Sequence, residues 1–362
     1  MANDDHMFGG LAEKVEAGAR LTPEEGVALL ESDDLLAVGL LADRARKRMV
    51  GEVAYFVNNR HINYTNICKN RCDFCAFSRD EDEEGAYRLS LSQMQAAAIE
   101  AVAQGATEFH IVGGEHPGVT YAEVREMVAG LHAVAPEVHL VAFTASEIVH
   151  FAEQSGLSER EVLLDLRSAG LGSLPGGGAE VFSPRVRQLV CPRKISGERW
   201  LSIHTLAHEC GLPTNATMLY GHVETPEERI DHLIRLREAQ DASGGFQAFI
   251  PLAFHSAHTK LSHLPATTGV DDLKMVAVAR LMLDNFRHIK AYWVMIGLKT
   301  AQLALFFGAN DLDGTIHEET ITFMAGGESG RGVAREELVR LIQTAGRVPV
   351  ERDSLYSEIR RW

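Results

Sequence analysis

Hydrophobic and polar residues follow two alternating periods along the chain. The first fifty residues repeat apolar positions with a helical period, and Thr22-Pro23-Glu24-Glu25 combines an N-cap hydroxyl with a proline and a capping-box glutamate. From Val53 onwards apolar residues occupy every second position, which predicts an extended segment over residues 53–66. Further predicted strands cover residues 109–112, 138–143, 172–174, 214–219, 246–250 and 289–295. Predicted helices open at Ser92, Thr120, Thr225, Asp271 and Arg335.

Strand and helix therefore alternate, an order that predicts parallel strands joined by helical crossovers. Such units form either an open doubly wound sheet or a partly or fully closed barrel, and the periodicity does not distinguish the two. Both architectures place their site at the carboxyl ends of the strands. Glycine and polar residues follow the predicted strands there, at residues 68–75, 113–116, 144–146, 176–180, 220–222 and 255–258. A glycine-rich stretch at residues 326–332 predicts either a lid or a linker.

The composition narrows the class of protein. With 46% apolar and 23% charged residues among 362, the chain is expected to build a globular core. Its 50 acidic side chains outnumber the 35 basic ones, and the net charge of −15 disfavours binding to nucleic acid. No apolar run approaches the ~20 residues that cross a bilayer, and the first residues, MANDDHMFGG, do not form a signal peptide. We therefore expect a cytoplasmic protein with neither a membrane nor a nucleic-acid partner.

Three of the five cysteines, Cys68, Cys72 and Cys75, fall within eight positions. An odd, clustered set does not suit a disulfide framework, whereas thiolates do suit zinc, copper(I) or iron–sulfur clusters. A structural zinc site prefers four ligands, and the remaining Cys191 and Cys210 lie nineteen residues apart. A [4Fe–4S] cluster held by three cysteines leaves one iron open to a further ligand.

This cysteine loop, with Phe74 before its last cysteine, resembles the signature loop of the radical S-adenosylmethionine (SAM) superfamily. Gly113-Gly114-Glu115, directly after a predicted strand, resembles the GGE motif of the same family. The resemblance implies an α/β fold: a TIM-type (β/α) barrel over residues 51–310, an N-terminal helical segment over 1–50, and a C-terminal extension over 311–362 packed on the barrel. It also implies one [4Fe–4S] cluster on Cys68, Cys72 and Cys75, with SAM on the open iron as a co-substrate. The cofactor-binding residues that we expect are Phe74, Gly113, Gly114, Glu115 and Ser146.

Other stretches resemble one subgroup of this family, the enzymes that make menaquinone through futalosine and the related deazaflavin synthases. Residues 61–68, 75–79, 174–180, 250–255, 289–293 and 307–315 carry this similarity, and the last four stretches are similar to aminofutalosine synthase. The chain departs from the family at Ser256, where proline is expected, and at residues 322–327. The resemblance implies that SAM's adenosyl group is joined to 3-[(1-carboxyvinyl)oxy]benzoate, which gives 6-amino-6-deoxyfutalosine, methionine and bicarbonate.

A substrate with two carboxylates requires hydrogen-bond donors inside an acidic protein. Candidate donors at the predicted strand ends are His61, Arg79, Thr144, Ser146, His222 and His255. Among these we assign catalytic roles to His61 and His255, and we add Glu180, which follows three glycines. Each of these residues also fits a purely structural hydrogen bond. The expected partners are the aromatic dicarboxylate and a reducing electron donor such as flavodoxin or ferredoxin.

Two alternatives remain open at this point. A dehypoxanthine futalosine cyclase or a deazaflavin-forming (FO) synthase would use the same cofactors but begin by abstracting hydrogen from its substrate. A non-catalytic iron–sulfur or zinc protein would bind metal at the same cysteines without any use for SAM.

Overall fold

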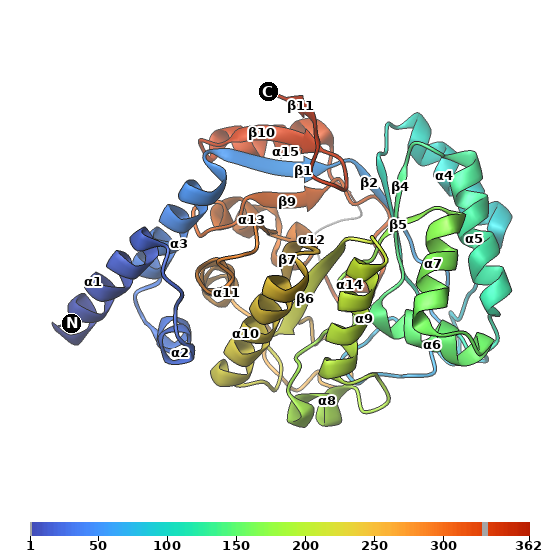
Figure 1. Cartoon of the computed structure of the whole chain (residues 1–362), viewed down its shortest axis with the longest axis horizontal. Helices are drawn as coiled ribbons and strands as arrows, with labels where there is room; N and C mark the ends of the chain where they lie inside the picture. The colour runs from blue at the N-terminus through green and yellow to red at the C-terminus, as the bar shows by residue number, and fades with distance from the viewer. Residues whose placement is uncertain (1, 328–331) are drawn as a thin grey trace.

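Three helices open the chain and pack on one flank of the molecule. A computed structural model describes residues 2–327 and 332–362, so most of the glycine-rich stretch predicted as a lid or linker lies outside the described residues. The opening helices are α1 (Ala2–Ala17), α2 (Pro23–Glu31) and α3 (Leu35–Val50). Thr22 caps α2 with the predicted capping box, in which its side chain accepts from the Glu25 N–H and Glu25 accepts from the Thr22 N–H. Figure 1 shows these helices, in blue, at the opposite end of the molecule from α4 to α7.

Eight parallel strands form the centre of the fold. They are β2 (Asn59–Ile62), β3 (Glu108–Ile111), β4 (His139–Ala142), β5 (Leu171–Ser173), β6 (Thr214–Tyr220), β7 (Phe246–Ala253), β8 (His288–Ile289) and β9 (Asp311–Gly314). Strands β2 to β5 pair in sequence order, and so do β6 to β8. Parallel bridges Leu174–Thr214, Lys290–Asp311 and Arg60–His317 join the remaining neighbours. The strands therefore close into a complete ring, which settles the choice between an open sheet and a barrel.

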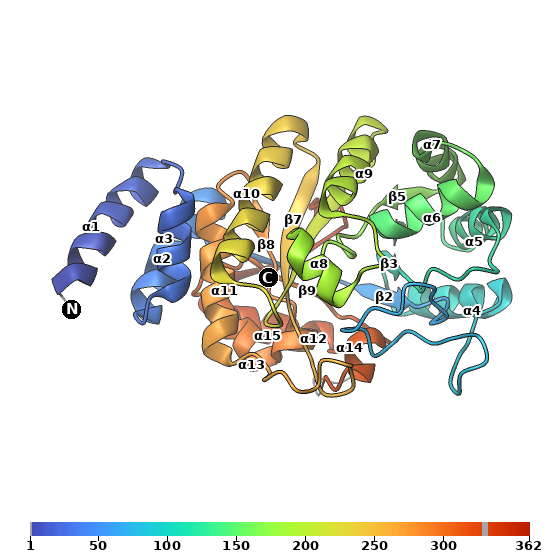
Figure 2. The ribbon, with the colours of Figure 1, turned by 90° about the horizontal axis from the view of Figure 1, so that it is seen from below.

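Helical crossovers surround this ring. They are α4 (Leu91–Ala103), α5 (Tyr121–Val134), α6 (Ala145–Ser155), α7 (Glu159–Ala169), α8 (Pro184–Val190), α9 (Gly197–Glu209), α10 (Pro226–Ser243), α11 (Gly269–Met282), α12 (Trp293–Ile296) and α13 (Leu298–Ala304). Seen from below in Figure 2, α11, α10, α9 and then α7 to α4 follow one another around the strands. This arrangement is the TIM-type α/β barrel that the resemblance implied.

The last segment of the chain returns to the first strand. It contains α14 (Ile321–Met324), α15 (Arg335–Thr344), β10 (Val348–Arg352) and β11 (Glu358–Arg361). Strand β1 (Val53–Val57) lies between β9 and β10 and runs parallel to both, while β11 pairs antiparallel with β10. One continuous hydrophobic core includes Leu41 of α3, Phe109 of β3, Val276 of α11 and Ile342 of α15. Both ends of the chain therefore share the core of the barrel.

Several element boundaries differ from the sequence predictions. Helix α4 is capped by Ser90 rather than Ser92, because two serines two residues apart each have a glutamine three positions later and only Ser90 forms the capping box. The strand predicted over residues 289–295 ends at Ile289, and the aromatic residues after it begin helix α12, where the Trp293 indole donates to the Gly314 carbonyl (2.8 Å). The extended segment over 53–66 is interrupted at Asn58.

Candidate active site

A cavity of about 300 Å³ opens at the carboxyl ends of the barrel strands, a volume in the range of small-molecule sites. Nearly every site residue predicted from the sequence lines it: His61, Cys68, Cys72, Phe74, Cys75, Gly113, Gly114, Glu115, Glu180 and His255. Ser146 does not line it, and neither do Arg79 and His222, two of the candidate substrate donors. The barrel thus brings together residues that lie almost two hundred positions apart in the chain.

The cysteine loop follows β2 and is folded back on itself. The Cys68 N–H donates to the Arg79 carbonyl (3.1 Å), the Arg79 N–H donates to the Asn66 carbonyl (2.8 Å), and the Cys75 N–H donates to the Cys72 carbonyl (3.0 Å). The Arg79 guanidinium donates to carbonyls of the same loop, so this candidate substrate donor supports the loop instead. All three thiols are free, and burial raises the pKa of Cys68 and of Cys72.

Three free thiols on one loop, all facing one cavity, fit a [4Fe–4S] cluster that takes one thiolate per iron. In the part of the chain that the structure describes, no three His, Cys, Asp or Glu side chains converge as the ligands of a single metal ion. Cys191 and Cys210 are buried away from the lining of the cavity.

The two glycines of the GGE motif allow the end of β3 to touch the cysteine loop. A Cβ at Gly114 would lie 2.2 Å from the Ile67 carbonyl oxygen, and a Cβ at Gly113 would lie 2.7 Å from the Tyr64 ring. The Gly114 N–H donates to the Thr65 carbonyl (2.9 Å). Any side chain at either position would therefore push the motif away from the cysteines.

Glu115 is buried beside this contact and is held by several donors. The Asn70 amide donates to its Oε1 (2.6 Å), the Lys69 ammonium lies 3.5 Å from its Oε2, and the Ser146 hydroxyl donates to its Oε1. Ser146 is itself buried and does not line the cavity. Its hydroxyl is directed at Glu115 and orients that carboxylate, so a direct contact of Ser146 with the cofactor stays a prediction.

Glu147 is a second buried carboxylate at the cavity, and the sequence analysis did not select it. It is the third residue of α6, and its carboxylate accepts from the Thr144 N–H (2.7 Å), the Tyr64 hydroxyl (2.8 Å) and the Gly113 N–H (3.3 Å). Burial raises its pKa to about 7. Its capping-box position directly after a predicted strand was the signal that could have identified it.

Glu180 and Lys194 form an ion pair at the side of the cavity. The Lys194 ammonium lies 2.6 Å from Glu180 Oε1 and 5.6 Å from the centre of the Phe74 ring. Burial lowers the pKa of Lys194, but the Glu180 and Cys72 side chains outweigh burial and raise it well above its usual value. Glu180 has a positive φ of 47°, a conformation that is uncommon outside glycine and often marks a functional position. Lys194 lies in a loop between two helices, and the sequence analysis placed site residues only at the ends of predicted strands.

The two predicted catalytic histidines lie at different depths. The His255 imidazole is half-buried near the mouth, and its Nε2 donates to the Met295 carbonyl (2.9 Å). His61 lies deeper in the barrel and stacks on His110, with 4.6 Å between ring centres. Burial and the neighbouring His110 lower the pKa of His61 well below its usual value, so its imidazole is neutral.

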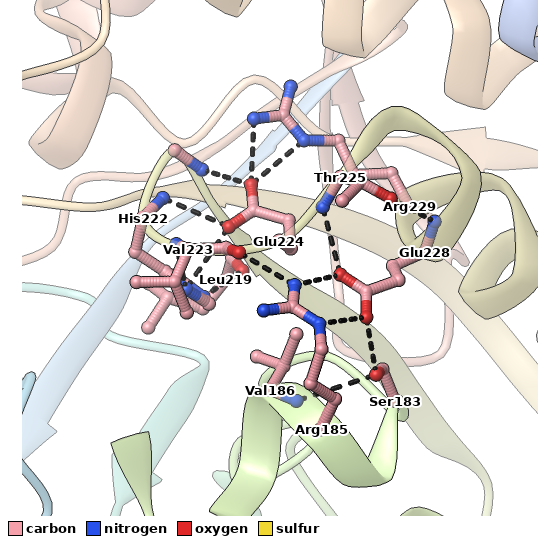
Figure 3. A network of polar contacts seen from close by, with 11 residues as sticks. Ser183, Arg185, Val186, Leu219, His222, Val223, Glu224, Thr225, Glu228 and Arg229 are labelled. Atoms are coloured by element: carbon pink, nitrogen blue, oxygen red, sulfur yellow. Dashed lines mark hydrogen bonds and ion pairs between the residues drawn. The ribbon is translucent and has the colours of Figure 1, made fainter. Parts of the chain in front are cut away.

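His222 belongs to a structural network and not to the cavity lining. Its Nε2 donates to the Leu219 carbonyl (3.0 Å), and its Nδ1 accepts from the Val223 N–H (2.8 Å). As Figure 3 shows, Glu224 joins this loop to Arg229, whose guanidinium lies 2.7 Å away. The network closes the loop between β6 and α10, and both nitrogens of His222 are occupied within it.

Comparisons with known proteins agree with this site. A model of the radical SAM superfamily matches residues 62–236, and a model of the CofH/MqnC C-terminal region matches residues 243–362. The aminodeoxyfutalosine synthase of Thermus thermophilus is 48% identical over 97% of this chain and 96% of its own length. The aminodeoxyfutalosine synthase of Streptomyces coelicolor is 44% identical over 97% of this chain and 94% of its own.

More distant relatives carry a different name. The 5-amino-6-(D-ribitylamino)uracil–L-tyrosine 4-hydroxyphenyl transferase of Methanothermobacter thermautotrophicus is 39% identical over 94% of both chains. Among solved structures, methylornithine synthase has a TM-score of 0.75 at 20% identity and covers 94% of this chain and 97% of its own, a likeness of fold alone. In the described residues, no helix combines the length and apolar character that crossing a membrane requires. The chain belongs to the radical SAM superfamily and is an enzyme that binds a [4Fe–4S] cluster and SAM.

Proposed function

We propose that this enzyme is an aminodeoxyfutalosine synthase of menaquinone biosynthesis. In the proposed reaction SAM, 3-[(1-carboxyvinyl)oxy]benzoate and water give 6-amino-6-deoxyfutalosine, methionine, bicarbonate and a proton. The observation that carries this proposal is the identity of 48% and 44% to two synthases over nearly their whole length. The tyrosine 4-hydroxyphenyl transferases reach 39% to 42% over 88% to 98% of this chain.

In this proposal Cys68, Cys72 and Cys75 hold the cluster. When bound, the cluster supplies the electron that cleaves SAM into methionine and the 5′-deoxyadenosyl radical. We assign Glu115 as the acceptor for SAM's ammonium group, since its carboxylate is buried and pre-oriented by Asn70 and Ser146. Gly113 and Gly114 let the backbone approach the cofactor, and Phe74 lies beside it.

The remaining predicted residues are assigned to the second substrate and to the ribose. Glu180, held by Lys194, is positioned to accept a hydrogen bond from a ribose hydroxyl. His255 and the more deeply buried His61 both line the cavity and offer imidazole groups to the second substrate. Walls of the barrel exclude water around the reacting carbons, which protects a radical from side reactions. We further propose that the enzyme acts in the cytoplasm, where its five free cysteines stay reduced and a flavodoxin or ferredoxin supplies electrons.

The test is a product assay on protein reconstituted with iron and sulfide under anaerobic conditions. Incubation with SAM, reductant and the enolpyruvyl benzoate should yield 6-amino-6-deoxyfutalosine and methionine in equal amounts by mass spectrometry. Accumulation of 5′-deoxyadenosine without an adenosyl adduct would contradict adenosyl transfer and favour a hydrogen-abstracting cyclase. A Cys72→Ala variant is the control, and it should bind less iron and give no product.

The relatives at 39% to 42% identity support a second candidate, transfer of the 4-hydroxyphenyl group of tyrosine. The same preparation incubated with tyrosine and 5-amino-6-(D-ribitylamino)uracil distinguishes the two. If an adduct of these compounds forms and the enolpyruvyl benzoate remains unchanged, the synthase proposal is wrong and the second candidate replaces it.

A further inference from the structure

We propose that Lys290, His61 and His110, on the floor of the cavity, bind the ring carboxylate of the aromatic substrate and so decide which end of the substrate faces the cysteines. This inference rests on the proposed function. It assigns a substrate-binding role to Lys290 and His110, neither of which is part of the cysteine or GGE motif. It also replaces the catalytic role of His61 with a binding role.

The floor is built from four strands that are neighbours around the barrel. Lys290 directly follows β8 and forms the bridge to β9, Asp313 belongs to β9, and His61 of β2 is paired in register with His110 of β3. All four side chains line the cavity. Closure of the ring is what brings Lys290 to the histidines, because β8 and β9 lie next to β2 only in the closed barrel.

The floor presents hydrogen-bond donors that no group in the described part of the chain uses. The Lys290 ammonium donates one N–H to Asp313 Oδ1 (2.9 Å) and carries two more. The imidazoles of His61 and His110 make no hydrogen bond to any residue that the structure describes, although His61 is only 8% exposed. Buried polar groups without partners are costly, so partners are expected from a bound ligand.

Two carboxylates also face the floor, and protein donors engage both oxygens of Glu108 and one oxygen of Asp313. Asp313 accepts from Lys290, and Glu108 accepts from the Asn59 amide (3.2 Å) and the Ser354 hydroxyl (2.8 Å). Burial raises the pKa of Glu108 and Asp313, yet the charges of Lys290 and Arg352 together outweigh it and hold both pKa values below their usual range. The Lys290 ammonium and one N–H of each neutral imidazole are therefore free to donate to an anionic ligand.

The opposite wall of the cavity carries apolar side chains that match an aromatic ring, beside the polar Asn215 and Thr217 of β6. Pro175 after β5, Leu219 of β6, and Ile250 and Leu252 of β7 line it. A flat benzoate ring can pack against these side chains while its carboxylate points to Lys290. The reacting double bond must lie near the cysteines, and the ring carboxylate is at the other end of the substrate, so this orientation satisfies both ends.

Equilibrium binding tests the inference without turnover. Reconstituted enzyme with SAM and no reductant is titrated calorimetrically with 3-[(1-carboxyvinyl)oxy]benzoate and with 2-phenoxyacrylate, which lacks the ring carboxylate. The wild type should bind 2-phenoxyacrylate roughly 10- to 100-fold more weakly, as expected for charge-assisted hydrogen bonds. In Lys290→Gln and in His110→Phe this preference should shrink to about 3-fold or less, because each variant removes a hydrogen-bond donor to the ring carboxylate.

Lys299→Gln is the matched control, since Lys299 is an exposed lysine on α13 and its replacement removes the same charge. It should keep the wild-type preference. If Lys290→Gln does not fold, as judged by circular dichroism and thermal melting, His110→Phe decides, because it keeps the ring stack and every charge on the floor.

Two results would overturn the inference: equal binding of both compounds by the wild type, or an unchanged preference in folded Lys290→Gln and His110→Phe. The product assay on the same wild-type preparation separates these results from failure of the proposed function. An enzyme that makes the adenosyl adduct but shows either result retains its function and loses only this orientation of the substrate.

Discussion

Glu147 is a buried carboxylate whose partners among the described residues are all neutral donors. Its hydrogen bonds to Thr144, Tyr64 and Gly113 favour the charged form, but burial is the larger effect and raises its pKa from 4.5 to about 7. The folded protein therefore holds a proton between these two pH values that the unfolded chain releases. For that reason this residue makes the fold less stable as pH rises.

Replacing Glu147 by Gln should remove this pH dependence. The wild type should lose on the order of 3 kcal/mol of unfolding free energy from this group as pH rises from about 4.5 to about 7, and Glu147→Gln should lose none of it. Urea denaturation of SAM-free protein at several pH values between 5 and 8 measures the difference. Glu123 occupies the same capping-box position on α5, where it is partly exposed, and its pKa is lowered to about 2. Glu123→Gln should therefore show no change of slope in this range, and equal slopes for all three proteins would contradict the argument.

The motifs that could be predicted from sequence are those whose partners lie nearby in the chain. The three cysteines act through one loop, and the GGE glycines follow their strand directly, so short patterns reveal them. Lys290 and His110 are separated by 180 positions and meet only because the barrel closes. Ser146 was assigned to the cofactor because it follows a strand, but its hydroxyl is directed at Glu115.

At the scale of single elements, local patterns gave the type of element more reliably than its ends. Ser90 and Ser92 offer the same capping signal, and only Ser90 caps the helix. The apolar residues after Ile289 look like a longer strand, but Trp293 turns inward to donate to Gly314 of the neighbouring strand. The tertiary contact that decides the second case is absent from a local window of sequence.

Helix α9 carries a polar residue in a position suited to an apolar one. His204 is fully buried against Trp200, with 3.7 Å between ring centres, and neither of its nitrogens has a hydrogen-bond partner among the described residues. Burial lowers its pKa well below 6.5. The folded state therefore binds fewer protons than the unfolded chain below about pH 6.5, and stability falls as the solution becomes more acidic.

His204→Leu should leave the fold equally stable or stabilise it by about 1–2 kcal/mol at pH 7.5, because it removes two unpaired buried polar atoms. The gain in stability of the variant over the wild type should be larger at pH 5.5, because there the unfolded wild-type chain takes up a proton at His204 that the folded protein does not bind. His232 is the control: it is buried too, but it accepts from the Phe182 N–H (3.2 Å) and donates to the Thr217 carbonyl (2.9 Å). His232→Leu should destabilise the protein. Urea denaturation at both pH values measures all three proteins, and a marked loss of stability in His204→Leu would contradict this reasoning.

At the scale of the whole molecule, the C-terminal strand β10 pairs with β1, next to β9 of the barrel. Arg352 at the end of β10 is buried, and its Nε donates to Asp311 Oδ2 of β9 (2.8 Å). Tyr356 donates to the same carboxylate oxygen (2.7 Å), and the Arg352 guanidinium lies over its ring at 4.2 Å. Because β9 is also part of the ring that carries the cavity floor, the C-terminal segment supports the site from below.

Arg352→Met should therefore destabilise the barrel as well as the last strands. Removing one partner of a buried ion pair leaves Asp311 charged without a cation, which costs about 3–5 kcal/mol, and Asp311→Asn in the same protein should recover much of that loss. Arg361→Met is the control, because Arg361 pairs with Glu358 on the exposed strand β11 and such pairs contribute about 0–1 kcal/mol. Denaturation followed by tryptophan fluorescence, with all variants made in a Trp362→Phe background, reports on the barrel through the buried Trp200 and Trp293. If Arg352→Met unfolds at the wild-type urea concentration by this signal, the C-terminal segment does not stabilise the ring, and the floor of the cavity depends on the eight strands alone.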